Sequence, residues 1–284
     1  MNNGYNNGYN NGYNNGNNNN GYYNSYNNNG YDNGYYNGYN NDGFGGNTMY
    51  QQQNAYHPQN TATVSLSDFT RKVYGWMFLG LAITFGLALM IVTNPQAALK
   101  LMSQHIEIYY VLAGLELVLV FTLGFFVTKL PPAAALAIFF AYSAVNGLTI
   151  APILLMYESG TVIAALGVTG GIFGAMSLYG MLTKRDLSGL GPVLIFGLIG
   201  LLIFSVIAMI FRMPMSDLLI SIGGIVLFIG FTAYDTQKIK AYYQGLQGDE
   251  VMLKKGAIVS ALQLYLDFIN LFLYVLRLFA SKNN

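Results

Sequence analysis

The chain has 284 residues, of which 54% are hydrophobic and 9% are charged, and its formal net charge is +1. A soluble domain carries about 25% charged residues, so this composition indicates an integral membrane protein. The small net charge gives no reason to expect a nucleic-acid partner, and the absence of cysteine excludes disulfides and thiolate metal sites.

Residues 1–67 are rich in Asn, Gly and Tyr, and the unit NNGY repeats from Asn2 to Tyr13. Glycine and asparagine favour turns, and no aliphatic run is available to bury. We therefore predict a disordered cytoplasmic tail over residues 1–67 and a transmembrane domain over residues 68–284. The regular tyrosines are also typical of segments that self-associate weakly, whereas the simpler interpretation is a solvated tail without a partner.

Seven apolar runs follow Arg71, each close to the roughly 20 residues that a helix needs to cross a bilayer. Short connections join them, which predicts an all-α membrane protein folded as one seven-transmembrane-helix bundle. The runs are Val73–Thr93, Ile106–Val127, Pro132–Met156, Thr161–Leu182, Leu190–Phe211, Asp217–Ile239 and Ala257–Ala280.

The basic residues predict how the bundle is oriented. With seven spans, most loop cations fall on one side of the bilayer, namely Arg71, Lys72, Lys129, Lys184, Arg185, Lys238, Lys240, Lys254 and Lys255. The other side holds Lys100, Arg212 and Lys282, with Arg277 near it. The positive-inside rule then places the N-terminus in the cytoplasm. We expect a multi-pass integral membrane protein, in the inner (cell) membrane if the chain is bacterial.

The last run carries a polar stripe on one helical face. Its members are spaced three and four residues apart: Ser260, Gln263, Asp267, Asn270, Tyr274 and Arg277. Within lipid such a face must turn toward other helices or water, which predicts a central C-terminal helix. The stripe lines either an ion path or a satisfied hydrogen-bond network, and the acid in mid-span favours the path.

Two acids lie inside apolar runs, Asp235 in the sixth and Asp267 in the seventh. A carboxylate at this depth costs several kcal/mol unless it is paired or protonated, so both are functional-site candidates. Two acids brought close together cannot both ionise easily, which predicts a proton sensor without histidine. His57 and His105 fall in the tail and a loop. Asp235 lies near the end of its run, so the sixth helix must extend past Ile239 or lie deeper for the two acids to meet.

Other polar side chains suggest an ion pathway. Glu116 lies in the second run, Asn146 in the third and Asn270 in the seventh, and their oxygens are of the kind that calcium prefers. We expect these three to line the path, and Asp235, Asp267 and Glu116 to bind calcium transiently. The fourth run has small residues at close spacing, which predicts close helix packing through Gly167, Gly170, Gly171, Gly174 and Ser177.

Enzyme signatures are missing from the sequence. It contains no HExxH, GxSxG or Walker motif, and the last run has no lysine that could hold retinal. Aspartates on neighbouring helices are also found in intramembrane aspartyl proteases, but Phe268 follows Asp267 where those enzymes usually have glycine. We therefore expect no enzymatic activity and no cofactor.

Two motifs carry a family resemblance, AYDTQKIK over residues 233–240 and LYLDFINLFLYVLRLF over residues 264–279. They resemble the Bax inhibitor-1-like (transmembrane Bax inhibitor motif) family, and the resemblance covers residues 68–284. It implies a seven-helix bundle with a central last helix, paired aspartates at Asp235 and Asp267, and a glutamate at Glu116. It also implies a basic residue at the cytoplasmic end of the second helix that acts as a latch on the aspartates. Lys129 holds that position here, and a lysine cannot form a bidentate pair of hydrogen bonds with carboxylates.

The resemblance implies a pH-sensitive calcium leak channel gated by Asp235 and Asp267, with Lys129 as the latch and calcium as the transported ion. The alternative is a non-conducting membrane regulator that binds a membrane protease or a cell-death or stress-response partner. A third hypothesis is a proton-coupled transporter. The expected partners are the lipid bilayer, calcium and such a protease or regulatory protein, with no nucleic acid.

Overall fold

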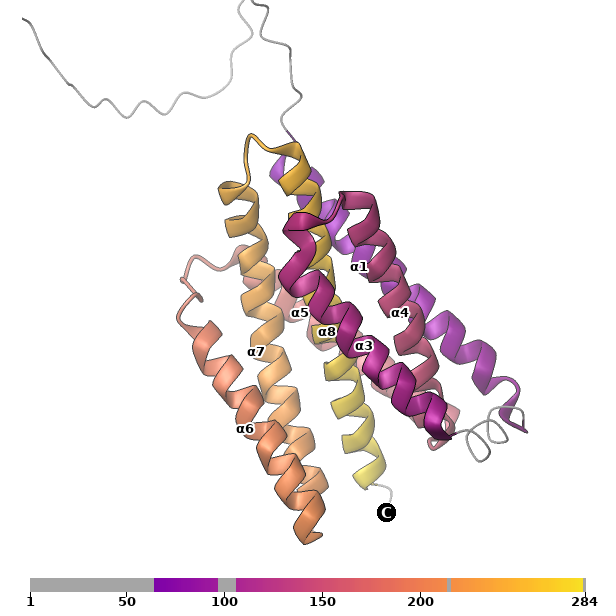
Figure 1. The fold of residues 1–284 in the computed structure, drawn as a ribbon. Helices are drawn as coiled ribbons and strands as arrows, with labels where there is room; N and C mark the ends of the chain where they lie inside the picture. The colour runs from indigo at the N-terminus through magenta and orange to yellow at the C-terminus, as the bar shows by residue number, and fades with distance from the viewer. Residues whose placement is uncertain (1–63, 97–105, 214–215, 283–284) are drawn as a thin grey trace, which may run out of the picture. The chain divides into compact units, whose positions relative to one another are not determined.

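The computed structural model describes residues 64–96, 106–213 and 216–282 (Figure 1). Residues 1–63, with His57, and the segment that holds His105 lie outside the described residues. Within the described ranges the chain forms helices, turns and no β-strand. The elements are α1 (Leu66–Val92), α3 (Ile106–Phe126), the short 3-10 helix η1 (Val127–Lys129), α4 (Pro132–Leu155), α5 (Ser159–Leu182), α6 (Leu190–Phe211), α7 (Ser216–Gly245) and α8 (Glu250–Lys282).

Each predicted run lies within one of these helices or differs from it by a few terminal residues. All seven long helices have the length and hydropathy to cross a membrane. The prediction of an all-α protein with seven transmembrane helices is therefore confirmed.

Local signals explain where several helices begin and end. The Ser65 side chain accepts a hydrogen bond from the Asp68 backbone N–H at 3.1 Å and caps α1. The helix therefore begins at Leu66, seven residues before Val73, where the predicted run starts. Proline occupies the first position of α4, where its missing N–H costs nothing. Arg212 ends α6 in the left-handed conformation, with φ of 47°.

The hairpin between α7 and α8 extends beyond the apolar runs. α7 continues six residues past Ile239 to Gly245, and α8 begins at Glu250. The turn between them uses Gly248 at φ of 92°, a conformation suited to glycine. Asp249 Oδ1 accepts a hydrogen bond from Met252 N at 2.9 Å, which caps the start of α8. The sixth span therefore extends past Ile239, one of the two options that the sequence left open.

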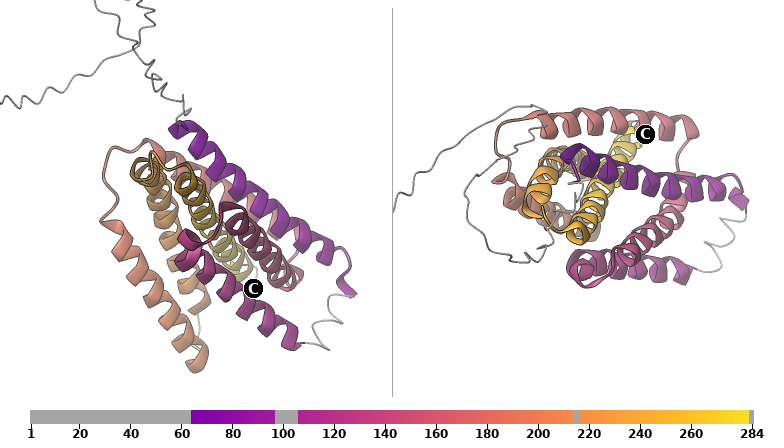
Figure 2. Two further views of the ribbon diagram at one scale, coloured as in Figure 1. Left: turned by 45° about the horizontal axis from the view of Figure 1, so that its top comes forward. Right: turned by 90° about the horizontal axis from the view of Figure 1, so that it is seen from above.

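α8 is the central helix, as predicted. It packs against α1, α4, α5 and α7, and it has the largest share of buried residues among the seven spans. Seen from above, α8 passes between α7 and the pair formed by α1 and α4, with α5 along a further side (Figure 2). The two least buried helices, α3 and α6, pack against α4 and α7 respectively.

Aromatic side chains fill much of the space around α8. Tyr265 is fully buried and meets Phe139 edge to face at a centroid distance of 5.7 Å. Phe268 packs edge to face on Phe173 at 5.4 Å and on Phe85 at 6.4 Å. Such pairs are worth about 0.5–1.5 kcal/mol beyond the area they bury, so they help to fix the rotation of α8 in the bundle.

The small residues predicted to bring α5 close to a neighbour do so only in part. An added Cβ at Gly167, Gly170, Gly171 or Gly174 would meet nothing within 4 Å, so the prediction is wrong for these four glycines. The close approach is instead at Gly180, where an added Cβ would lie 2.3 Å from the Ala233 carbonyl oxygen of α7. Ser177 is buried on the same face of α5.

Candidate functional site

The two candidate acids lie in the core, on α7 and α8. Asp235 is 8% exposed and Asp267 is 4% exposed. The Oδ2 atom of Asp267 is buried and has no hydrogen-bond partner in the part of the chain that the structure describes. A buried polar atom left unpaired costs about 1–3 kcal/mol, and such atoms in a native structure often mark function.

Lys238 joins the two acids in one electrostatic cluster. Its Nζ lies 4.0 Å from Asp235 Oδ1, one turn along α7, and its side chain is about one-third exposed. The charge of Asp235 acts on Asp267, and the charge of Lys238 acts on both carboxyl groups. Lys238 Nζ also lies 5.5 Å from the centroid of the Tyr234 ring and 5.3 Å from that of Tyr242. The cluster therefore consists of two acids and one cation, and the rings of Tyr234 and Tyr242 flank the cation.

The pairing of Lys238 with Asp235 was not predicted from the sequence, because the sixth run was expected to end near Ile239 and Lys238 was counted as a loop cation. The i,i+3 spacing from Asp235 to Lys238 is a helical pairing signal that would have found it.

The cytoplasm-facing half of α7, as the sequence predicts it, is held to α5 and the α5–α6 connection by polar contacts. The Gln237 side chain donates to the Arg185 carbonyl and accepts from the Leu187 N–H, both at 2.7 Å. Lys240 Nζ donates to the Met181 carbonyl, and the Thr236 and Ser177 hydroxyl oxygens lie 3.5 Å apart. These bonds are made by the residues that follow Asp235 on α7, so movement of this half of α7 requires them to break.

Glu116 belongs to a second polar network. Its Oε1 accepts hydrogen bonds from Thr149 Oγ1 at 2.6 Å and from Asn146 Nδ2 at 3.2 Å, which joins α3 to α4. Asn146 Oδ1 accepts from the Tyr265 hydroxyl of α8 at 3.0 Å, and that hydroxyl lies 2.6 Å from Thr84 Oγ1 of α1. Four helices thus share one chain of hydrogen bonds, buried at Tyr265 and partly buried at Glu116, a network that can fix their relative rotation.

The two networks lie on different sides of α8. Tyr265 and Asp267 are two residues apart, which is about 200° around a helix with 3.6 residues per turn. No group of three or more His, Cys, Asp or Glu side chains gathers as a metal site among the described residues. The structure therefore does not bring Glu116 together with Asp235 and Asp267 as the expected calcium ligands. The third predicted pathway residue, Asn270, donates to the Leu266 carbonyl of its own helix at 2.8 Å.

Lys129, the predicted latch, forms no ion pair with Asp235 or Asp267 within the described residues. It ends η1 as an exposed residue, and its Nζ lies 5.5 Å from the centroid of the Phe126 ring. The cation beside the aspartates is Lys238. A different lysine ties this part of the chain to α8, since the buried Lys255 donates to the Thr128 carbonyl at 2.7 Å.

The fold and the site define a multi-pass integral membrane protein with seven helices and two buried acids on the last two. Residues 66–284 match the family described as "Inhibitor of apoptosis-promoting Bax1". The chain belongs to this family, the Bax inhibitor-1 family, and the resemblance carried by the two motifs is confirmed.

Bacterial relatives support this assignment. "Inner membrane protein YbhL" of Escherichia coli K12 is 38% identical over 218 residues, covering 76% of this chain and 93% of the relative. A protein of Deinococcus radiodurans is 36% identical over 233 residues, which are 82% of this chain and 98% of the relative. A membrane protein of Streptococcus pyogenes serotype M1 is 37% identical over 221 residues, with 78% and 95% covered.

Proposed function

We propose that the protein is a pH-sensitive calcium leak channel in which Asp235 and Asp267 sense protons and gate the path. The observation that carries the proposal is the unpartnered carboxyl oxygen of Asp267, buried in a membrane helix beside a second acid and one lysine. A purely structural site would favour a fully hydrogen-bonded carboxyl group or an apolar residue. We propose further that the helix ends near Lys238 face the cytoplasm, as the distribution of basic residues predicts.

Gating follows from the charge that the two acids share. While Asp267 of α8 carries negative charge, it attracts the Lys238 ammonium of α7, and this attraction between the helices keeps this half of α7 against α8. The Asp235–Lys238 pair, 4.0 Å apart, lies within α7 and moves with it, so the attraction that bears on the closed–open equilibrium is the one between Lys238 and Asp267 of α8.

The direction of the pH response is opening in acid. Protonation of Asp267 removes its attraction for Lys238, so α7 can separate from α8. Neutral acids are also poorer ligands for calcium. Release of α7 dominates first as the pH falls, and loss of ligand charge dominates at lower pH, so calcium flux passes through a maximum.

Calcium flux into liposomes that contain the purified protein tests the proposal. The wild-type flux should rise on mild acidification. Lys238→Gln should raise the flux at neutral pH, because the attraction is already lost, and should change it little in acid. Lys129→Gln is the matched control, since it removes an exposed lysine that does not face the aspartates, and it should behave as wild type.

The outcome also separates the competing functions. A folded wild-type protein that passes no calcium at any pH contradicts the channel and favours a non-conducting regulator that binds a protease or stress-response partner. Proton movement in fixed ratio to the transported ion favours a proton-coupled transporter. Equal effects of Lys238→Gln and Lys129→Gln on the calcium flux would show that Lys238 does not gate the path.

A further inference from the structure

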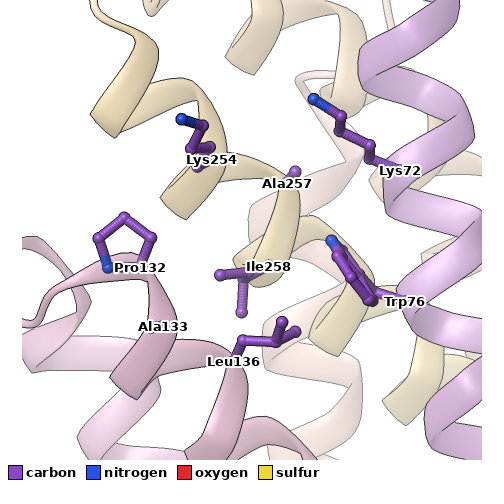
Figure 3. A pocket seen from close by; sticks show the side chains of 8 residues that line it. All are labelled: Lys72, Trp76, Pro132, Ala133, Leu136, Lys254, Ala257 and Ile258. Atoms are coloured by element: carbon purple, nitrogen blue, oxygen red, sulfur yellow. The ribbon is translucent and has the colours of Figure 1, made fainter.

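A pocket of about 240 Å³ lies between the starts of α1, α4 and α8, away from the two acids (Figure 3). A single water molecule needs about 10–15 Å³ of such space, so this pocket has room for a larger group. Ala133 of α4 and Ala257 of α8 form part of its wall, and each of the three helices also contributes a pair of residues one turn apart. They are Lys72 and Trp76 on α1, Pro132 and Leu136 on α4, and Lys254 and Ile258 on α8.

These six residues form two layers. The Lys72 and Lys254 side chains lie at the outer level, uppermost in Figure 3, and Trp76, Leu136 and Ile258 lie below them. The i,i+4 spacing separates the layers by about 6 Å along each helix axis. The pocket therefore changes from cationic to apolar over a short depth, in the direction that leads from each helix end into its membrane-spanning part.

The outer layer has a net positive charge. The lining includes two lysines and no acid. Lys254 Nζ also lies 3.6 Å from Glu250 Oε2, but both side chains are more than half exposed, and such surface pairs are worth about 0–1 kcal/mol. α4 adds to the positive field, since it begins at Pro132 with its first-turn N–H groups unbonded by any capping side chain.

We propose that this pocket binds an anionic phospholipid, with Lys72 and Lys254 on its phosphate group and Trp76, Leu136 and Ile258 against the first carbons of an acyl chain. Lysine binds phosphate as a point charge, and tryptophan is enriched at the level of lipid headgroups. A soluble phosphate compound would match the lysines and leave the lower layer unused. The site is independent of the proposed calcium path.

The chain has one tryptophan, which is Trp76, so its fluorescence reports on this pocket alone. The purified full-length protein is placed in phosphatidylcholine vesicles with a small fraction of lipid brominated in the upper acyl chain. The brominated lipid is either phosphatidylglycerol or phosphatidylcholine, and bromine quenches tryptophan on contact. A lysine near the membrane surface is worth about 1 kcal/mol toward anionic lipid, which is about fivefold in occupancy for each lysine.

The expected result is stronger quenching by brominated phosphatidylglycerol, with an apparent preference of about fivefold or more over phosphatidylcholine. The double variant Lys72→Gln/Lys254→Gln should lose this preference. Lys184→Gln/Arg185→Gln removes two exposed charges elsewhere and should keep it. Comparing the two lipids within each variant cancels any change in the intrinsic fluorescence of Trp76.

Competition on the wild-type protein gives a second measurement that needs no variant. Unbrominated phosphatidylglycerol should relieve the quenching, and unbrominated phosphatidylcholine should do so about fivefold less well or worse. Equal competition by the two lipids would overturn the proposal, as would equal loss of preference in both double variants. Relief by inorganic phosphate at comparable occupancy would identify a soluble anion as the ligand and overturn the lipid assignment.

Discussion

Gly180 of α5 packs closely against α7 at Ala233, two residues before Asp235. An added Cβ would lie 2.3 Å from the Ala233 carbonyl oxygen and 3.0 Å from Thr236 Cβ. Both obstacles belong to the α7 backbone or its stiff β-branched side chain, so neither can rotate away. Gly180→Ala therefore pushes the two helices apart next to the acidic cluster.

The size of the effect follows from these distances. Ordinary contact begins at 3.4 Å, so the added methyl group must move about 1.1 Å away from the carbonyl oxygen. Overpacking of a well-packed interior costs about 1–3 kcal/mol, while alanine gains about 1 kcal/mol over glycine in helix propensity. We expect Gly180→Ala to lower the free energy of unfolding by up to about 2 kcal/mol relative to wild type.

Unfolding of the purified protein in detergent, followed by circular dichroism, measures this change. Gly174→Ala is the matched control on the same helix, because its Cβ would meet nothing within 4 Å. That variant should be as stable as wild type or more stable. If Gly180→Ala unfolds with the same free energy as Gly174→Ala, the close contact between α5 and α7 is not present in the protein.

Three further predictions concern other parts of the chain. Tyr265→Phe removes the hydroxyl between Asn146 and Thr84 and should cost about 1–2 kcal/mol in the same unfolding assay. Tyr142→Phe should cost less, since the Tyr142 hydroxyl makes no hydrogen bond recorded among the described residues. Deleting residues 1–62 should leave stability unchanged, whereas deleting residues 1–66 also removes the Ser65 cap and the Val64 carbonyl that Tyr243 binds at 2.9 Å, at a cost of about 1 kcal/mol. Hydrogen bonds from the Ser188 backbone and then its side chain lower the pKa of Asp186, so Ser188→Ala should raise that pKa in an NMR titration. Because the folded-state pKa is the lower one, this contact stabilises the fold above the unfolded-state pKa, and the contribution is lost as the pH falls through the folded value.

The number of helices and the central position of α8 could be predicted because both signals are local. Each apolar run matches the thickness of a bilayer, and the stripe that contains Asp267 marks the face of α8 that cannot meet lipid. The reach of α7 to Gly245 could not be predicted in this way, because hydropathy detects only the part of a helix that lies in the membrane. That extension is what makes Lys238 a helical neighbour of Asp235.

The partners of Glu116 were hidden for a different reason. Glu116 marks the face of α3 that turns away from lipid, but the sequence does not say which neighbouring helix that face meets, and the pairing with Asn146 and Thr149 depends on that neighbour. The glycines of α5 show the same ambiguity. Small residues suit a helix contact but do not require one, and α5 instead packs through the face with Ala165, Thr169, Phe173, Ser177 and Gly180.

The pH dependence of calcium flux in the Asp235→Asn and Asp267→Asn variants tests the central claim most directly. Each variant replaces one acid of the pair by a neutral side chain of the same size, and the proposal expects the two acids to titrate as a coupled pair. Asp217→Asn is the control, since Asp217 is an exposed acid in the first turn of α7. The account predicts a flattened pH profile with raised flux at neutral pH in both variants of the pair, and a wild-type profile in the control. A wild-type profile in Asp235→Asn and in Asp267→Asn, with both proteins folded, would contradict it.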